Sequence, residues 1–406
     1  MDKFEALKYY FGYDNFRNNQ EEIIDSLLAG VDTIAILATG GGKSLCFQIP
    51  ALIKEGLTLV VTPLISLMQN QVEELKQRNI KAEYITSEMS FHEISIVIEN
   101  AKKGNIKLLY VSPERLENDR YRAIFLTLDI SYIIIDEAHC ISIWGNDFRP
   151  SYQHIKYLIN NLAKRPVIGA FTATANKKVI DDIDKILQLN ELNIFKSGFD
   201  RPNLFYGVYK PKNKMNFLLK QLLSYPDELF LIYTVTKKEA TEVYLKLQSM
   251  NFKVGLYHGG LEANVKEECQ KKFMNEEYKI IVATNAFGMG INKPNIRNVI
   301  NYSLPLSMED LSQQSGRCSR DGKEGRCLLL YNEDDIRVCE YFIKQTKIPD
   351  KDLQKELIKE KYKQLKSVIN YVTTNKCLHH IMMDYFGQMS KNKCFMCSNC
   401  NKKSRR

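Results

Sequence analysis

The chain has 406 residues, of which 44% are hydrophobic and 26% are charged, and its formal net charge is +9. This length is too great for one ordinary core and predicts two domains with an appendage, while the mild positive charge is compatible with a polyanionic partner. No secretory leader opens the chain and no apolar run approaches the roughly 18 residues of a membrane span, so we expect a soluble intracellular protein, in the cytoplasm or nucleoid of a prokaryote or the nucleus of a eukaryote.

The first 60 residues predict a phosphate-binding loop. A helical pattern over 4–29, broken at 12–19, precedes a strand at 31–37, the loop ATGGGKS at 38–44 and an apolar helix. In this order of strand, glycine loop and helix, backbone N–H groups close round the phosphates, Lys43 reaches the β and γ phosphates, and Ser44 binds Mg²⁺. The strict pattern has glycine where Leu37 stands, so a flexible glycine turn is the alternative.

Four further apolar runs, at 58–62, 107–112, 132–136 and 167–174, alternate with amphipathic segments and predict a mostly parallel, doubly wound sheet. One of them ends in Asp136, which Glu137 follows. Ligands of open α/β sheets bind at such carboxyl ends. Two adjacent acids there suit nucleotide hydrolysis, because one can hold Mg²⁺ while the other deprotonates the attacking water. A solvated strand end is the alternative.

A short aromatic segment follows the acids. Trp144, the only tryptophan, lies with Phe148 and Arg149 between Gly145 and Pro150. Aromatic rings and a guanidinium stack on unpaired bases and bind phosphates, so this loop is a candidate nucleic-acid contact. The alternative is that Trp144 belongs to the core.

The strand pattern restarts after residue 200, with runs at 229–234, 253–258, 279–284, 297–303 and 326–331. This second α/β unit has no glycine phosphate loop. Arg317 and Arg320 are three residues apart and would share a face if their segment is helical. Arginine supplied across a cleft would stabilise charge on the γ-phosphate of ATP. A solvated basic face is the alternative.

The C-terminal part is helical and charged from Lys351 and then carries four cysteines in the spacing C-x16-C-x2-C-x2-C. Four thiolates with such short knuckles predict a structural tetrahedral Zn²⁺ site. The ligands are Cys377, Cys394, Cys397 and Cys400. The other six cysteines are scattered singly, and we expect buried thiols there.

Taken together, the motifs resemble one family, the RecQ DNA helicases of superfamily 2, over nearly the whole chain. In order they are FGYDNFRNNQEEII, TGGGKSLCFQIPAL, VTPLISLMQNQV, YVSPERL, DEAHCIS-WG-DFRP, FTATA, YHGGL, ATNAFGMGI and SGR-SRDG. The resemblance implies two tandem RecA-like parallel-sheet domains, at 1–200 and 201–340, and a small helical zinc-binding subdomain with a basic tail at 341–406.

The resemblance also implies a role for each motif residue. Mg²⁺ would lie on Ser44 and Asp136, Glu137 would be the general base, and His139 would couple the ATP site to DNA. Trp144, Phe148 and Arg149 would bind DNA, and Arg320 rather than Arg317 would be the arginine finger. The ATP-binding residues would be Tyr13, Arg17 and Gln20, which read adenine, and Thr39, Gly40, Gly41, Gly42, Lys43 and Ser44 on the phosphates.

By this resemblance the chain is an ATP-dependent helicase that moves 3′ to 5′ on single-stranded and partially duplex DNA. It would act as a monomer in recombination, repair or replication, with single-strand-binding or recombination proteins as possible partners. The sequence departs from the family pattern at several positions: Ile143, Asn146, Lys237, Asn292, Asn295 and Ser319.

The sequence ends after the zinc ligands, without a winged helix, and is therefore expected to be a minimal catalytic core. Two alternatives follow: a DNA-stimulated translocase that does not separate strands, and a non-catalytic zinc-stabilised DNA-binding module. An RNA helicase is a further alternative.

Overall fold

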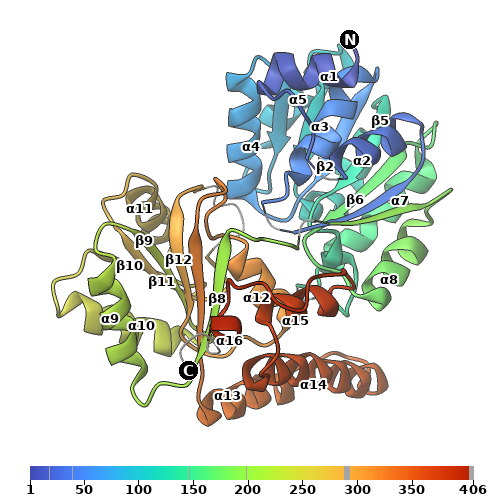
Figure 1. Ribbon diagram of the computed structural model, residues 1–406. Coiled ribbons are helices and arrows are strands. Elements are labelled where there is room, and N and C mark those ends of the chain that lie inside the picture. The colour runs from blue at the N-terminus through green and yellow to red at the C-terminus, as the bar shows by residue number, and fades with distance from the viewer. Residues whose placement is uncertain (18, 39, 146, 198, 288–292, 402–406) are drawn as a thin grey trace. The chain divides into compact units, whose positions relative to one another are not determined.

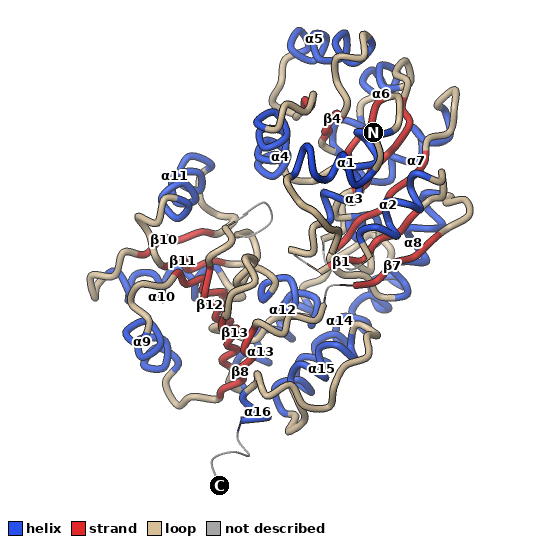
Figure 2. The backbone as a smooth tube through the Cα atoms, turned by 45° about the horizontal axis from the view of Figure 1, so that its top comes forward, coloured by secondary structure: helices blue, strands red, loops and turns tan. Residues whose placement is uncertain are grey.

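The computed structural model describes residues 1–17, 19–38, 40–145, 147–197, 199–287 and 293–401. The chain divides into two compact units, Met1–Gly198 and Phe199–Arg406, and each unit is built round its own sheet (Figures 1 and 2). Thr39, Asn146 and Asn292 lie outside the described residues. Within the described part, no helix is both long enough and apolar enough to cross a membrane.

The first unit contains, in its described residues, a seven-stranded sheet with the order β3-β4-β2-β5-β6-β1-β7, and all neighbouring strands are parallel. The strands are β1 (Thr33–Leu37), β2 (Leu57–Val61), β3 (Ala82–Ile85), β4 (Leu108–Val111), β5 (Ile130–Ile135), β6 (Val167–Thr172) and β7 (Asn193–Ser197). The α-helices are α1 (Lys3–Ala6), α2 (Gln20–Leu28), α3 (Lys43–Ile53), α4 (Ile65–Gln77), α5 (Phe91–Lys102), α6 (Asp119–Phe125), α7 (Ile155–Asn161) and α8 (Lys177–Leu187). The shorter turns are η1 (Leu7–Phe11), η2 (Pro113–Glu117), η3 (Ala138–Ile141) and η4 (Pro150–His154).

The central strands of this sheet are buried on both faces. Every residue of β1, β2 and β4 is buried, which explains why these segments read as unbroken apolar runs. On one face, Val60, Tyr110 and Phe171 pack with residues of α2, α3 and α4 in one hydrophobic cluster. The carboxyl ends of β1 and β5 carry the glycine loop and the acidic pair, so the sheet places both motifs at the same edge.

The second unit contains a six-stranded parallel sheet among its described residues, in the order β10-β11-β9-β12-β13-β8. The strands are β8 (Leu204–Tyr209), β9 (Leu229–Tyr233), β10 (Val254–Tyr257), β11 (Ile280–Ala283), β12 (Ile296–Asn301) and β13 (Gly325–Leu330). The helices are α9 (Lys214–Ser224), α10 (Lys237–Gln248), α11 (Ala263–Met274), α12 (Met308–Ser315), α13 (Glu333–Lys344), α14 (Lys351–Thr373), α15 (Leu378–Tyr385) and α16 (Ser398–Asn401).

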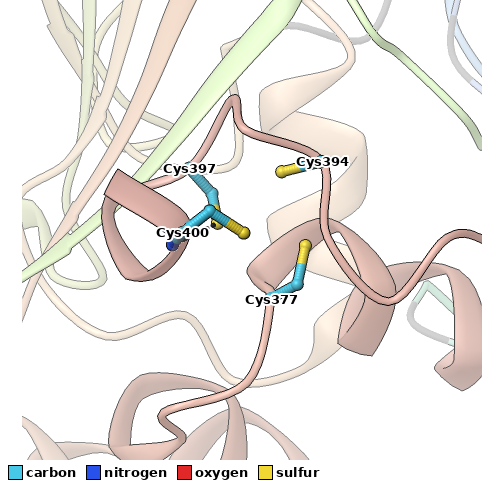
Figure 3. Close-up of side chains that lie close together, drawn as sticks. All are labelled: Cys377, Cys394, Cys397 and Cys400. Carbon is cyan, nitrogen blue, oxygen red and sulfur yellow. Dashed lines mark hydrogen bonds between the residues drawn. The ribbon is translucent and has the colours of Figure 1, made fainter. Parts of the chain in front are cut away.

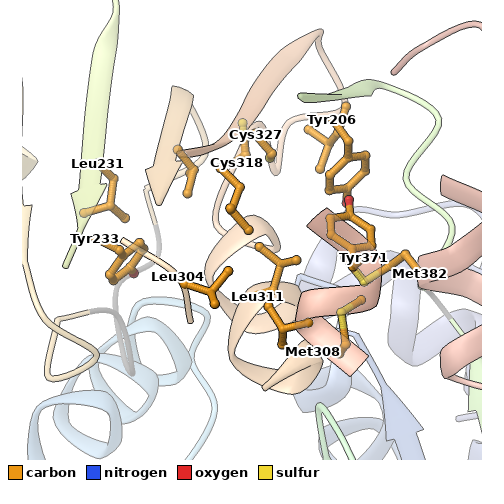
Figure 4. Close-up of a cluster of buried hydrophobic side chains, with 14 of the residues drawn as sticks. Tyr206, Leu231, Tyr233, Leu304, Met308, Leu311, Cys318, Cys327, Tyr371 and Met382 are labelled. Atoms are coloured by element: carbon orange, nitrogen blue, oxygen red, sulfur yellow. The ribbon is translucent and has the colours of Figure 1, made fainter. Parts of the chain in front are cut away.

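Alternate residues of β9 face opposite sides of this second sheet, as the period of a strand requires. Phe230 and Ile232 pack with α9 and α10. Leu231 and Tyr233 face the cluster drawn in Figure 4, where α12 and the long helix α14 supply Leu311 and Tyr371, among others. The C-terminal helices therefore share a core with the second sheet.

The predicted α/β architecture is confirmed, with two parallel sheets followed by a helical region that carries the four cysteines. The ten strands expected from apolar runs are all present. Three further strands, β3, β7 and β8, were not predicted. The interrupted N-terminal helix is also confirmed: it consists of α1, the π-helical turn η1 and α2, and the chain turns at Gly12, whose φ is +72°.

Candidate nucleotide, nucleic-acid and metal sites

The described part of the glycine loop joins β1 directly to α3. Gly42, with φ +77°, precedes the first helical residue, Lys43, and the N–H groups of that first turn lack partners within the helix. Gln20 fastens this loop: its Nε2 donates to the carbonyl oxygens of Gly41 at 3.4 Å and Gly42 at 3.2 Å. Its Oε1 accepts the backbone N–H of Arg17 at 2.8 Å. The expected adenine-reading segment is thus tied to the phosphate loop.

The glycine loop and the acidic pair converge on one point. Lys43 Nζ lies 3.4 Å from Glu137 Oε1, and both side chains are largely buried. Burial raises the pKa of Asp136 to about 6 against the opposing influence of the Lys43 charge. The hydroxyl of Ser44 accepts a hydrogen bond from Gln71 Nε2 of α4 at 3.4 Å. A lysine and a hydroxyl from the start of α3 and two acids from the end of β5 therefore lie at one edge of the sheet.

Glu137 has a left-handed backbone, with φ +50° and ψ +46°. This conformation is strained for a residue with a side chain and is typical of functional positions. The Glu137 N–H donates to Asp136 Oδ1 at 3.0 Å, which holds the two acids in a fixed relation.

His139 lies beside the acids. Its Nδ1 is 2.9 Å from Thr172 Oγ1 and 3.4 Å from Glu137 Oε2. The Thr172 hydroxyl donates to the carbonyl oxygen of Thr174 at 3.0 Å, so Nδ1 is the natural donor to Thr172. Burial lowers the pKa of His139, so the ring is neutral at neutral pH. It links Glu137 to the end of β6.

The aromatic loop, defined here as residues 142–145 and 147–149, turns back on η3. Gly145 is required there, because a Cβ atom at this position would collide with the carbonyl oxygen of His139. Arg149 contacts Asp147 at 3.1 Å, the carbonyl oxygen of Pro63 at 3.1 Å and Glu114 at 3.6 Å. Its guanidinium thus holds the loop to the end of β2.

Trp144 and Phe148 are both half-buried. The Trp144 ring is covered on one face, where Lys178 of α8 places Nζ 4.1 Å from the ring centroid. The loop therefore presents a capped ring rather than the open platform that its composition suggested.

Arg317 and Arg320 lie in the second unit, beyond the end of α12. The condition for a shared helical face is not met, because α12 ends at Ser315 and the arginines occupy the turn that follows. Within this turn Ser319 has a left-handed backbone, with φ +44°. Arg317 is only 5% exposed, which excludes the alternative of a solvated basic face for this residue.

The turn that carries the arginines is held by two neighbouring groups. Arg201 donates through NH2 to the carbonyl oxygens of Cys318 at 2.9 Å and Ser319 at 3.0 Å. Arg297 donates to Ser319 Oγ at 3.0 Å and also pairs with Asp321. The serine that replaces the family's glycine is therefore accommodated by its hydroxyl contacts.

Burial, together with the nearby guanidinium groups of Arg317 and Arg201, lowers the pKa of Arg320 to about 9. Three cations gathered at one turn create a positive field, which suits an anion such as a phosphate.

The four predicted zinc ligands come together. Their Sγ atoms all lie within 4.8 Å of one another and point toward a common centre (Figure 3). Tetrahedral Zn²⁺ with bonds of about 2.3 Å needs sulfur atoms about 3.8 Å apart, so small shifts suffice. The Met396 N–H donates to Cys394 Sγ at 3.3 Å and the Cys400 N–H to Cys397 Sγ at 3.4 Å. Four convergent thiol groups, two of which accept backbone N–H groups, fit a structural Zn²⁺ ion.

Burial raises the pKa of Cys400, but hydrogen bonds from the backbone of Cys394 and Phe395 outweigh it and bring the pKa to about 7. The cluster is also joined to the second sheet: the Tyr206 N–H of β8 donates to the carbonyl oxygen of Met396 at 3.1 Å. The other six cysteines are all buried, as predicted.

Of the remaining predicted residues, Tyr13 is 52% exposed and Gln20 is buried. Thr39 lies outside the described residues. Sequence reasoning missed four residues that contact the sites: Gln71, Thr172, Lys178 and Arg201. Gln71 and Thr172 lie inside recognised motifs, which was the available signal, whereas nothing in the sequence distinguishes Lys178 from its neighbour Lys177.

Three family models match consecutive parts of the chain. They are DEAD/DEAH box helicase over residues 17–183, helicase conserved C-terminal domain over 213–322 and RecQ zinc-binding over 333–401. The last segment contains all four cysteines of the cluster.

Similar proteins cover almost all of the chain. The ATP-dependent DNA helicase RecQ of Bacillus subtilis is 42% identical over 97% of this chain, and that of Pasteurella multocida is 36% identical over 98%. This chain spans 66% and 62% of their lengths. The putative ATP-dependent RNA helicase R290 of Acanthamoeba polyphaga mimivirus is 39% identical over 98% of this chain and 71% of its own length.

Solved structures share the fold at low sequence identity. Dbp5 of S. cerevisiae bound to RNA and ADP BeF3 has a TM-score of 0.67 at 19% identity, covering 90% of this chain and 97% of its own. The DUF1998 helicase MrfA bound to DNA has a TM-score of 0.67 at 17% identity, and the match covers 85% of this chain and 50% of the MrfA chain. These structures show the fold alone, whereas the order of the three family models and the identity to the two bacterial relatives show that the chain belongs to the RecQ family of helicases.

Proposed function

We propose that this chain is an ATP-dependent DNA helicase that translocates 3′ to 5′ along single strands and opens partial duplexes. In this proposal it works as a monomer that single-strand-binding or recombination proteins can join. The observation that carries it is the convergence of Lys43 and Glu137, 3.4 Å apart at the carboxyl edge of the first sheet, within a RecQ family chain.

The ATP chemistry follows from these residues. Lys43 and the N–H groups at the start of α3 bind the β and γ phosphates. Ser44 and Asp136 are the oxygen donors that suit Mg²⁺, which would neutralise phosphate charge. Glu137 accepts a proton from the attacking water, and its fixed backbone keeps the carboxylate oriented.

Further contacts are assigned by the same reasoning. Tyr13, Arg17 and Gln20 read the adenine, and reading by Gln20 requires it to exchange its present backbone contacts for the base. Arg320, supported by Arg317, acts on the γ-phosphate as the arginine finger. The positive field round Arg320 supports this assignment.

Coupling to nucleic acid runs through His139. The Nδ1 atom of this ring contacts both Glu137 and Thr172, and the aromatic loop begins three residues later. Single-stranded bases stack at Trp144 and Phe148, and Arg149 binds the strand backbone. A change of loop conformation then alters the position of Glu137.

An RNA substrate is the second candidate. It is favoured by one observation, the 39% identity to a viral relative named a putative RNA helicase. The zinc-binding segment and the bacterial relatives support DNA.

The deciding experiment measures ATP-dependent strand displacement on DNA partial duplexes with a 3′ or a 5′ single-stranded tail, and on the matching RNA duplexes. We expect displacement only from the 3′-tailed DNA, and none with Lys43→Ala, which cannot hold the phosphates. Glu99→Gln, an exposed change on α5, is the control for a general loss of fold.

Strand displacement on the RNA duplexes but not on the DNA duplexes would show that the substrate is RNA rather than DNA. ATP turnover that rises with DNA without any displacement would show a translocase instead. Absence of nucleic-acid-stimulated turnover in the unmodified chain would overturn the proposed enzyme altogether.

A further inference from the structure

Helix α8 holds the aromatic loop at two points. The Ser142 hydroxyl donates a hydrogen bond of 2.6 Å to Asp182 Oδ2 of α8, and the Ser142 Oγ atom in turn accepts the Trp144 N–H at 3.1 Å. One turn earlier, Lys178 lies over the Trp144 ring. Positions 178 and 182 are four residues apart and therefore share one face of the helix. The loop is thus fastened through its backbone and, separately, through its ring.

The contact between Lys178 and Trp144 covers one face of the indole ring, and this is the kind of face on which nucleobases stack. An ammonium group 4.1 Å from a ring centroid is well inside the distance at which a cation is attracted to an aromatic face. A nucleobase stacks on the same kind of face. Trp144 is half-buried, and a ligand cannot reach the face beneath Lys178 while the ammonium group lies over it.

The position of α8 connects this contact to the ATP side of the unit. The helix begins five residues after Thr172, the residue that contacts His139. Lys178 therefore sits on the element that follows the histidine's partner, and its contact with Trp144 ties the loop to that element.

We propose that Lys178 is a positioning residue that occupies the stacking face of Trp144, and that a nucleobase of a single strand must displace its ammonium to stack there. The proposal rests on the proposed function, because it assumes that single strands reach this loop. It predicts that the lysine sets how much nucleic acid is needed to stimulate ATP turnover.

The chain offers a matched control. Lys177 is adjacent, exposed and equally charged, and the ring contact belongs to Lys178. Replacing either lysine by glutamine removes one positive charge from the first turn of α8, so the electrostatic loss is shared. Lys178→Arg keeps a cation that can lie over the ring and serves as the conservative replacement.

Trp144 provides a direct readout because it is the only tryptophan of the chain. Quenching of its fluorescence by acrylamide is measured first without nucleic acid, and an oligo(dT) titration of ATP turnover follows. We expect stronger quenching in K178Q than in K177Q. We also expect K178Q to reach half-maximal stimulation at about two- to fivefold less oligonucleotide than K177Q, the change expected from an exposed cation–π contact. K178R should behave as the unmodified chain.

Equal quenching in K178Q and K177Q would overturn the ring contact, and equal half-maximal concentrations would overturn the competition. If oligo(dT) stimulates none of the proteins, the proposed function fails. The inference is then judged by the oligonucleotide concentration that protects Trp144 from acrylamide. A lower concentration in K178Q than in K177Q supports it, and equal concentrations or no protection refute it.

Discussion

Glu137 combines a strained backbone with a position between Lys43 and His139. A residue held at φ +50° by its surroundings is oriented before any ligand binds, which suits a general base. This feature was not visible in the sequence, where an acidic pair after a strand has the same pattern whether or not its backbone is strained.

Glu137→Gln should leave ATP binding within about threefold of the unmodified chain and reduce turnover about 10²- to 10⁴-fold, because the amide keeps the shape but cannot accept the proton. Nucleotide binding is measured by equilibrium titration and turnover by phosphate release. Glu99→Gln on the exposed face of α5 should change neither quantity. Retained turnover would remove Glu137 from the general-base role.

Asp310 in the first turn of α12 is buried, and burial raises its pKa to about 6 from 3.8. The neutral carboxyl is favoured in the folded chain, so its stabilising contribution is complete below pH 3.8 and is lost as the pH rises through about 6. The difference corresponds to about 3 kcal/mol at most.

Asp310→Asn should therefore stabilise the second unit more at pH 8 than at pH 5, because the amide is neutral at both. Urea unfolding followed by circular dichroism gives the free energy of unfolding at each pH. Asp334→Asn, an exposed acid in the first turn of α13, is the control and should show no such dependence. A gain that is equal at both pH values would contradict the assignment to Asp310.

Among the elements, the aromatic loop depends most on a single glycine. Gly145→Ala should abolish stimulation of ATP turnover by single strands while basal turnover persists, because a Cβ atom cannot fit against the His139 carbonyl and the loop must open. The milder Ser142→Ala change, which removes the hydroxyl shared by Asp182 and the Trp144 N–H, should reduce stimulation only in part. Full stimulation in Gly145→Ala would show that the loop shape does not matter for coupling.

The sequence predicted the interior of each sheet better than its borders. The three strands that were not predicted, β3, β7 and β8, all lie at sheet edges. The edge strand β7 has the exposed and partly polar sequence NIFKS, so it lacks the apolar run by which interior strands are recognised, whereas β8 carries such a run, LFYGVY, and its omission has no such cause. Propensity patterns carry little information about such positions.

Sequence patterns also predicted some residues of the candidate sites and not others. The zinc ligands were predictable because four cysteines at short spacings have few other uses. Whether Arg317 and Arg320 share a helical face could not be decided from spacing, because α12 ends at Ser315 and Ser319 in the following turn has a left-handed backbone that is held by the distant Arg297. Lys178 over Trp144 is likewise a tertiary contact that spacing does not encode.

At the scale of the molecule, the cysteine cluster belongs to the second unit and Trp144 to the first. Removal of Zn²⁺ by a chelator should lower the thermal transition of the second unit by several degrees, since the metal holds the segment that contacts β8. The thermal transition of the first unit, which the fluorescence of Trp144 reports, should stay at the same temperature. Calorimetry and fluorescence separate the two events.

Cys400→Ser should reproduce the effect of the chelator. Cys269→Ala, which removes a buried thiol outside the cluster, should leave the response to the chelator intact. A tryptophan transition that shifts as much as the calorimetric one would mean that the metal stabilises both units.

The strand β8 is the first of its sheet to be synthesised and lies at the edge. Its partner on one side is β13, and its other side receives the backbone of Met396 and the Ser398 hydroxyl, which accepts the Val208 N–H at 3.2 Å. At about 5–20 residues per second, synthesis from β8 to β13 takes on the order of ten seconds. During that time an aromatic-rich strand, LFYGVY, has neither neighbour. Zinc-depleted cells should therefore accumulate this protein in aggregates, because without the metal the last knuckle does not close and the outer side of β8 stays uncovered after translation is complete.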